Sequence, residues 1–347
     1  MRKEEDNVVI HFDEQKYLKI NHNTLKLKDQ IEKVTEQVSK KGYKNVFLVG
    51  SGGSYAMFLP FEYYLRTRST VQAYAVIAAE LIAGGHNQLG EGSVCIFTST
   101  SGTTEETVAA AEYCRMKGAD TICISGRGDV PYAKNAEYAI VNEMDDFSAA
   151  DGDYFLLYML IFSLIHERGE FEEYEEFCDN LKKMPEALVA VKYACEEKME
   201  AFAEKYKDTD YHLLTGAGSV WGETYSYGMC VMEEMQWIRT KTVKAAEFFH
   251  GTLEIVDKDV SLMVIMGEDE LRPQCERVVN FAKKLGFTEN LNIFDTADYE
   301  LPQIDAKFRP LLSPVIMTAI LDRLSYQLED KRGHSLDIRR YYRQMEY

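Results

Sequence analysis

A short apolar strand that runs into a glycine turn occurs twice in this chain of 347 residues, and this recurrence restricts the possible folds more than any other feature. The first copy reads LVGSG and the second LTGAG. Three pairs of similar segments share one spacing: 48–52 with 214–218, 79–81 with 246–248, and 117–118 with 285–286. All the offsets lie close to 167 residues. Such agreement indicates an internal repeat.

Short apolar runs, rich in β-branched residues, alternate with helix-like segments in both halves. The predicted strands are 45–50, 71–77, 93–99, 120–125 and 137–142, then 211–218, 241–248, 260–267 and 290–295. Segments with helical spacing or a glycine stop accompany them at 24–41, 105–118 and 270–287. Alternation at this spacing predicts right-handed crossovers and parallel sheets.

The repeat therefore predicts an α/β fold with two similar units. We expect an N-terminal extension (1–25), a phosphate-binding first domain (26–170) and acidic connecting helices (171–205). A second domain with acid/base residues (206–330) and a C-terminal tail that closes the site (331–347) follow. In open sheets of this kind, ligands bind beyond the carboxyl ends of the strands.

Charge and composition exclude several classes of function. The formal net charge is −18, whereas a nucleic-acid partner requires a basic face. We find no run of 18 uncharged apolar residues and no apolar leader, so we expect neither a membrane span nor a secretion signal. Seven scattered cysteines without a CxxC or CxxH pair favour a reduced, cytoplasmic location and no structural zinc.

Two loops have the chemistry of an anion site. Gly52, Gly53 and Ser54 follow a strand and precede a helix, where backbone N–H groups can approach a phosphate; a plain strand-to-helix turn explains this loop equally well. The spacing is not that of a dinucleotide-binding turn, because position 55 is Tyr. The second loop, 98–107, crowds hydroxyls before an acidic helical turn.

The hydroxyl-rich loop favours phosphate over simple capping, because an N-cap needs only one Ser or Thr. Its candidates are Ser99, Thr100, Ser101 and Thr104. The equivalent place in the second repeat, 266–270, is acidic and would repel phosphate. One repeat is therefore predicted to bind the anion and the other to have lost that role.

The second half offers an acid/base pair. Glu234 lies on a predicted helix after the second glycine turn, and His250 follows a predicted strand, with Glu247 between them. A carboxylate and an imidazole suit proton removal and return during sugar rearrangement. His250 before Gly251 could equally cap a turn. We predict no metal and no nicotinamide or other cofactor.

In combination these motifs resemble the sugar isomerase (SIS) domain superfamily. Residues 234–250, ending in AEFFHGTLE, resemble the isomerase half of glucosamine-6-phosphate synthase. The segments EEMQWI and AAEFFHGTLEIV and the tail RRYYRQMEY are still more similar to fructosamine-6-phosphate deglycases, which act on fructoselysine or fructose-asparagine phosphates. The resemblance implies two flavodoxin-like SIS domains in tandem and a homodimer whose site is shared between subunits.

The same resemblance implies roles for individual residues. Glu234 would be the base at the sugar carbon, and His250 would assist ring opening and reach the neighbouring subunit. The phosphate would be held by Ser99, Ser101 and Thr104 with help from Ser54. The wider set of substrate-binding candidates is Gly52, Gly53, Ser54, Ser99, Thr100, Ser101, Thr104, Asp151, Glu247 and His334.

The chain also departs from the synthase pattern. The stretch before Glu234 is Cys230-Val231-Met232-Glu233, without the synthase lysine, and Thr252 replaces the usual proline. No segment corresponds to the glutaminase domain. These differences disfavour the synthase activity.

The leading hypothesis is a hydrolytic deglycase that converts a 6-phosphorylated sugar–amine adduct into a hexose 6-phosphate and an amine or amino acid. An adduct on carbon 1 would give glucose 6-phosphate, and one on carbon 2 would give fructose 6-phosphate. The alternatives are an isomerase or deaminase of glucosamine 6-phosphate and a non-catalytic sugar-phosphate sensor. The residues do not identify the amine, nor do they distinguish a dimer from a higher assembly.

Overall fold

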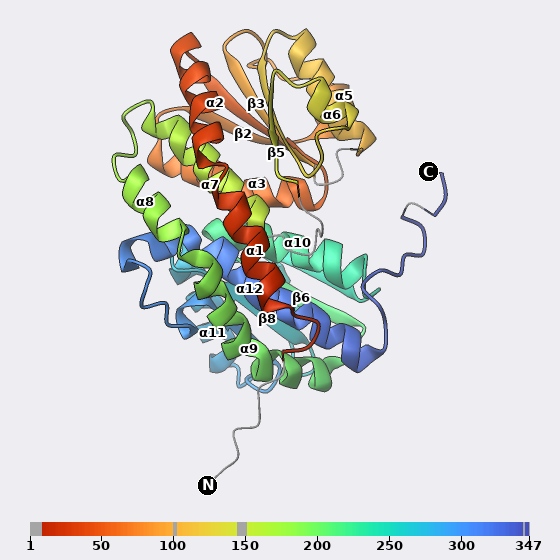
Figure 1. The fold of residues 1–347 in the computed structure, drawn as a ribbon. Coiled ribbons are helices and arrows are strands. Elements are labelled where there is room, and N and C mark those ends of the chain that lie inside the picture. The colour runs from red at the N-terminus through yellow and green to blue at the C-terminus, as the bar shows by residue number, and fades with distance from the viewer. Residues whose placement is uncertain (1–8, 100–102, 144–150, 343, 347) are drawn as a thin grey trace. The chain divides into compact units, whose positions relative to one another are not determined.

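The computed structural model describes residues 9–99, 103–143, 151–342 and 344–346 (Figure 1). The chain divides into two compact units. The first-sheet unit comprises Lys19–Lys182, and the second-sheet unit comprises Met1–Leu18 and Lys183–Tyr347. The division falls inside helix α1 (Glu14–Leu25).

The first-sheet unit alternates strands and helices along the chain. Its elements are α2 (Lys28–Lys41), β1 (Asn45–Gly50), α3 (Gly53–Arg68), β2 (Gln72–Ile77), α4 (Ala78–Gly84), β3 (Ser93–Ser99), α5 (Glu105–Met116), β4 (Asp120–Ser125), α6 (Pro131–Lys134), β5 (Tyr138–Val141), α7 (Asp151–His166) and α8 (Tyr174–Leu181). All pairings are parallel, in the order β2-β1-β3-β4-β5, with Asn45 opposite both Gln72 and Ser93.

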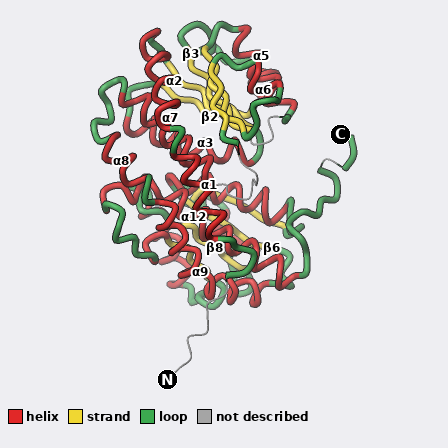
Figure 2. Tube along the Cα trace, viewed as in Figure 1, coloured by secondary structure: helices red, strands yellow, loops and turns green. Residues whose placement is uncertain are grey.

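Helices cover both faces of this sheet. Figure 1 shows α2 and α7 on one side of the strands and α5 and α6 on the other, and Figure 2 shows strands β2 and β3 in yellow among them. Alternate strand residues such as Phe47, Val49 and Phe97 are fully buried against α4, α5 and α6. Because their neighbours in sequence are also buried, the central strands β1 and β3 are buried on both faces, as a doubly covered sheet requires.

The second-sheet unit repeats this plan with one strand fewer. Its elements are α9 (Met184–Tyr206), β6 (Tyr211–Gly216), α10 (Trp221–Ser226), a π-helical segment (Tyr227–Glu233), β7 (Arg239–Lys244), β8 (Ser261–Met266), α11 (Arg272–Lys284), β9 (Leu291–Asp295) and α12 (Arg309–Arg332). The sheet is parallel, in the order β7-β6-β8-β9.

Buried ion pairing joins the two long helices of this unit. Arg323 of α12 is fully buried, and its Nε donates to Glu196 Oε2 of α9 over 2.7 Å. Gln327 donates to the other carboxylate oxygen, also over 2.7 Å. The carboxylate is therefore paired and hydrogen-bonded, which is the condition for burying it.

The α/β fold with parallel sheets flanked by helices is confirmed, and the predicted strands lie within a few residues of the observed ones. One prediction is wrong at its end: the strand expected at 241–248 stops at Lys244, and Ala245–His250 form turns. That segment turns inward at Ala245 and Phe248, which are buried under α11. Among the described residues, no helix is long and apolar enough to cross a membrane. The domain limits remain predictions.

A buried histidine lies in the core of the second-sheet unit. His212 on β6 has no exposed surface, and its Nδ1 lies 2.8 Å from the Ser261 hydroxyl. Within the described part of the chain, its Nε2 has no hydrogen-bond partner. Burial, together with the positive charge of Arg332, lowers the pKa of His212 to about 4.

We expect acid to destabilise this unit through His212. The unfolded imidazole binds a proton near pH 6.5, whereas the folded one stays neutral down to about 4. The contribution of neutral His212 to the free energy of unfolding is therefore fully present above pH 6.5. The free energy of unfolding falls by roughly 3 kcal/mol as the pH drops to 4. Urea unfolding followed by tryptophan fluorescence measures it, because Trp221 and Trp237 both lie in this unit.

The variant His212→Asn should have a shallower dependence of stability on pH over this range. The control Ser261→Ala keeps the imidazole and should retain the wild-type slope. A slope in His212→Asn equal to that of the wild type would contradict this assignment.

Candidate functional site

The predicted phosphate loops lie at neighbouring strand ends in the first-sheet unit. Strands β1 and β3 are adjacent and parallel, and they end at Gly50 and Ser99. The strand order reverses between them, since β1 continues to β2 on one side and β3 to β4 on the other. Such a switch point opens a crevice at the carboxyl edge, where doubly wound sheets bind ligands.

The Gly52 turn is shaped for a close backbone approach. Gly52 has φ +57°, and a Cβ placed there would meet no atom within 4 Å, so the turn is open on that side. In contrast, Gly50 has no room for a side chain, because a Cβ there would lie 2.7 Å from the Tyr55 backbone nitrogen. Helix α3 begins at Gly53 without a side-chain cap. The N–H of Ser54 donates to Ser51 O over 3.2 Å, so it is the absence of a side-chain cap, together with the positive end of the helix dipole, that favours an anion here.

Sequence reasoning left one residue of this turn out of the candidate set. The Ser51 hydroxyl is buried and has no hydrogen-bond partner within the described residues. A buried polar atom is normally satisfied by protein, water or ligand. Ser51 therefore joins Gly52, Gly53 and Ser54 as a candidate phosphate ligand. Its place in the GSGGS motif was the available signal.

The hydroxyl-rich loop is described only at its two ends. Ser99 is buried at the end of β3, and Thr104 lies at the N-cap of α5. The Thr104 side chain makes no capping hydrogen bond, so helix capping does not explain its hydroxyl. Thr100 and Ser101 lie outside the described residues. Asp151 is buried at the start of α7.

The equivalent turn in the second-sheet unit is already filled by a carboxylate. Asp269 Oδ2 accepts hydrogen bonds from the backbone N–H of Ser219 (2.7 Å) and from its hydroxyl (2.5 Å). Its Oδ1 accepts from the backbone N–H of Leu271 over 2.9 Å. Gly218, with φ +59°, leaves room for this contact, because a Cβ there would lie 2.2 Å from Asp269 Oδ1.

Ion pairs occupy the rest of that carboxyl edge. Glu268 accepts two hydrogen bonds from Arg309 (2.7 and 2.8 Å), and Asp295 accepts two from Arg272 (2.6 and 2.8 Å). Within the acidic segment 266–270, Glu268 is thus paired with an arginine and Asp269 is hydrogen-bonded to Ser219 and Leu271. The loss of the anion role in the second repeat remains a prediction, and these contacts are consistent with it.

The candidate base Glu234 lies just past the π-helical segment rather than inside a helix. Its Oε1 accepts a hydrogen bond from Arg339 Nε over 2.7 Å. The adjacent Glu233 is directed elsewhere, since its Oε1 accepts from the Thr240 hydroxyl over 2.6 Å. Burial raises the pKa of the neighbouring Cys230 thiol to about 11, with the Glu234 carboxylate contributing. That thiol is therefore protonated at neutral pH.

Glu247 and His250 lie on the exposed turns after β7. Phe248 is buried and anchors this segment, whereas the side chains of Glu247 and His250 are exposed. The backbone N–H of His250 donates to Glu247 O over 3.0 Å. No hydrogen bond or ion pair joins the described side chains of His250 and Glu234.

His334 lies close to the segment that follows Glu234. Its backbone carbonyl accepts from Gln236 Nε2 over 2.7 Å, and its ring centroid lies 4.4 Å from that of Trp237. The structure thus brings two predicted residues, Glu234 and His334, to one region of the second-sheet unit. The phosphate candidates belong to the first-sheet unit.

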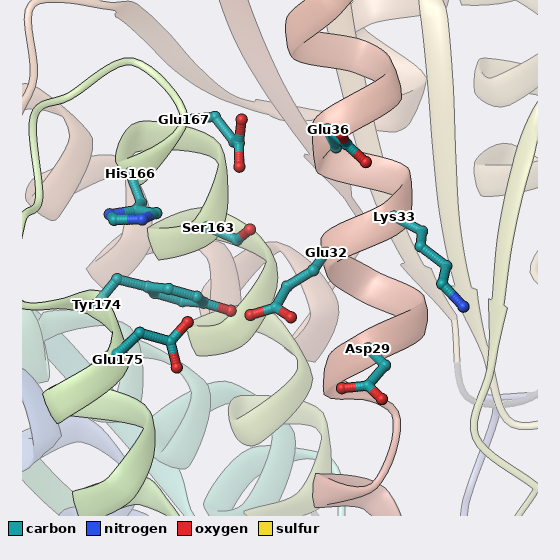
Figure 3. A pocket seen from close by; sticks show the side chains of 9 residues that line it. All are labelled: Asp29, Glu32, Lys33, Glu36, Ser163, His166, Glu167, Tyr174 and Glu175. Carbon is teal, nitrogen blue, oxygen red and sulfur yellow. The ribbon is translucent and has the colours of Figure 1, made fainter.

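A cavity of about 430 Å³ lies elsewhere in the first-sheet unit, among residues of α2, α7 and α8 (Figure 3). It is lined by Asp29, Glu32, Lys33, Glu36, Ser163, His166, Glu167, Tyr174 and Glu175. His166 stacks on Tyr174 and its Nδ1 lies 2.8 Å from Phe171 O, which agrees with a structural role. The lining contains none of the predicted site residues.

Comparison with known proteins gives a consistent result. Residues 41–163 match the SIS domain. The chain is 33% identical over 329 residues to fructosamine deglycase FrlB of Bacillus subtilis (strain 168), covering 93% of this chain and 99% of that protein. It is 27% identical over 312 residues to fructoselysine 6-phosphate deglycase of Escherichia coli (strain K12), covering 90% and 89%.

A solved structure extends the likeness to three dimensions. The crystal structure of a Bacillus subtilis protein, provisionally assigned as a phosphosugar isomerase, superposes with a TM-score of 0.87 at 30% identity. The match covers 96% of this chain and 99% of that one. The likeness therefore extends over both units.

The carboxylate in the second glycine turn is expected to stabilise its unit. In Asp269→Ala the buried N–H and hydroxyl of Ser219 lose their acceptor, so the free energy of unfolding should fall by about 3 kcal/mol. Urea unfolding followed by tryptophan fluorescence measures the loss. Glu300→Ala, at an exposed carboxylate of the same unit, should change stability by less than about 0.5 kcal/mol. Equal stability of the two variants would contradict the role given to Asp269.

Proposed function

The chain belongs to the SIS-domain family that includes the fructosamine deglycases, and we propose from this membership that it is a deglycase. It hydrolyses a 6-phosphorylated sugar–amine adduct to a hexose 6-phosphate and an amine or amino acid. The observation that carries the proposal is 33% identity to a fructosamine deglycase over 99% of that protein's length.

The first-sheet unit supplies the phosphate site in this proposal. Three features support it: the open Gly52 turn, the start of α3 without a side-chain cap, and the Thr104 hydroxyl, which makes no capping bond. Helix N-termini and hydroxyls suit a phosphate without any lysine. Ser51, Ser54 and Ser99 complete the proposed ligand set. The filled turn at Gly218 supports one phosphate site per chain.

The proposed reaction is a proton transfer followed by hydrolysis. His250 assists opening of the sugar ring. Glu234 removes a proton from carbon 1, which gives an enaminol, and returns a proton to carbon 2. The product is an imine between carbon 1 and the amine nitrogen. Water adds to the imine and the carbon–nitrogen bond breaks, releasing glucose 6-phosphate and the amine. Positioning and acid/base groups suffice for each step.

The proposal also includes the domain arrangement, the oligomeric state and the location of the protein. Two flavodoxin-like SIS domains in tandem are supported by the shared strand order of the two sheets. A homodimer with a shared site is supported by the exposed side chain of His250, which has no hydrogen-bond partner among the described residues. A cytoplasmic location remains part of the proposal.

Loss of the base should abolish turnover. Glu234→Gln is expected to lower kcat by about a thousandfold, because an amide cannot accept the proton. A coupled assay for glucose 6-phosphate, with fructoselysine 6-phosphate and fructose-asparagine 6-phosphate in parallel, measures it and identifies the preferred amine. Glu233→Gln is the matched control and should retain most activity, since Glu233 is bonded to Thr240.

The outcomes separate the candidate functions. Near-normal turnover in Glu234→Gln would contradict the base assignment. Fructose 6-phosphate as the product would indicate an adduct on carbon 2, and faster release of ammonia from glucosamine 6-phosphate would indicate a deaminase. Binding of sugar phosphate without turnover of any substrate would indicate a sensor.

Thr104 distinguishes phosphate binding from helix capping. In Thr104→Ala we expect KM to rise about tenfold through loss of a hydrogen bond to a charged group. The melting temperature should stay close to that of the wild type, because the hydroxyl makes no cap bond. A lower melting temperature with unchanged KM would mean that Thr104 serves the helix instead.

A further inference from the structure

The backbone around Glu234 departs from regular helix on both sides. The N–H of Glu234 donates to Met229 O over 3.0 Å, a bond that spans five residues and closes the π-helical segment. Single π-helical turns are rare and occur frequently at functional sites. Three residues later, Trp237 has φ +56°, a left-handed conformation that a bulky side chain seldom adopts. Such strain persists only where surrounding contacts hold it.

Residues near the C-terminus provide those contacts. Gln236 is fully buried and donates from Nε2 to the backbone carbonyl of His334 over 2.7 Å, while the backbone carbonyl of Gln236 accepts from Arg332 Nη2 over 3.3 Å. The Arg340 guanidinium lies 3.9 Å from the centroid of the Trp237 ring. The segment 234–237 is therefore fixed by residues about a hundred positions away.

Arg339 is the one of these residues that touches the carboxylate of Glu234. Its Nε donates to Glu234 Oε1 over 2.7 Å, and its Nη1 donates to Leu336 O and to Ile338 O, the latter over 3.0 Å. The guanidinium is thus held by backbone carbonyls of its own segment as well as by the carboxylate. The side chains are 16% and 29% exposed, so the bond is partly shielded from water.

We propose that Arg339 is a positioning residue for Glu234 in the deglycase reaction. The inference rests on the proposed function, because it takes Glu234 as the base. A charge-assisted hydrogen bond on Oε1 selects one rotamer of the glutamate. Oε2, which has no hydrogen-bond partner among the described residues, is then the oxygen that receives the carbon 1 proton. Displacement of a reacting group by about 1 Å can cost roughly a hundredfold in rate.

If Arg339 served only to hold the C-terminal segment against residues 234–237, its loss would have different kinetic effects from the loss of a positioning residue. Loss of docking would affect Arg339 and Arg340 variants alike, because their contacts are neighbours. Loss of positioning would lower kcat and kcat/KM together in the Arg339 variant and leave KM near its wild-type value.

The kinetic arm compares Arg339→Ala, Arg339→Lys and Arg340→Ala in the full chain. We expect kcat to fall about a hundredfold in Arg339→Ala, less in Arg339→Lys, and least in Arg340→Ala. Millimolar guanidinium should partly restore kcat in Arg339→Ala and have no such effect on Arg340→Ala. Wild-type kcat in Arg339→Ala, or equal losses in the two alanine variants without rescue, would overturn the inference and leave the proposed function standing.

The second arm needs no turnover. Carbodiimide coupling of glycine ethyl ester to Glu234, read by mass spectrometry, should be slow in the wild type and faster in Arg339→Ala but not in Arg340→Ala. Equal labelling in the wild type and Arg339→Ala would overturn the inference. If the wild type turns over neither adduct, the proposed function fails, and with it the positioning role of Arg339 in that reaction. The labelling then reports only whether the pair with Glu234 exists.

Discussion

Backbone N–H groups at the start of a helix need an acceptor, and each unit of this chain meets that need differently at the first turn of its sheet. In the second-sheet unit the acceptor is internal, since Asp269 lies against Ser219 and leaves no room for an external anion. In the first-sheet unit the Gly52 turn is open, and the hydroxyls of Ser51 and Thr104 are left without protein partners within the described residues. The same strand–glycine–helix pattern thus gives one closed turn and one turn suited to phosphate.

In the proposed mechanism the second-sheet unit carries the acid/base groups. Its carboxyl edge is closed by Arg272 with Asp295 and by Arg309 with Glu268. Glu234 lies away from that edge, next to an edge strand, where a π-helical segment, a strained Trp237 and the pair with Arg339 meet. Strained backbone beside a carboxylate held in one position is typical of functional sites, where the surrounding contacts maintain a conformation that is locally unfavourable.

Much of the fold could be predicted because hydrophobic periodicity and glycine turns are local signals. The short apolar runs predicted the strands, whereas the loss of the second anion site, inferred from the acidic segment 266–270, remains a prediction. The contacts of Arg339 with Glu234 and of Asp269 with Ser219 were not predictable, since they join residues 105 and 50 positions apart. The end of β7 was misjudged because Ala245 and Phe248 are apolar for burial in a turn, which periodicity cannot distinguish from a strand. The roles of Glu234 and His250 came from resemblance and remain predictions.

The central claim is that this chain breaks a sugar–amine bond only after moving a proton from carbon 1 to carbon 2. Glu234 is partly exposed, so the proton it carries can exchange with solvent. The most direct measurement is the reaction of fructoselysine 6-phosphate in D2O, followed by NMR of the hexose phosphate. The account predicts glucose 6-phosphate with deuterium on carbon 2, together with free lysine. Release of lysine with no deuterium on carbon 2 would contradict it.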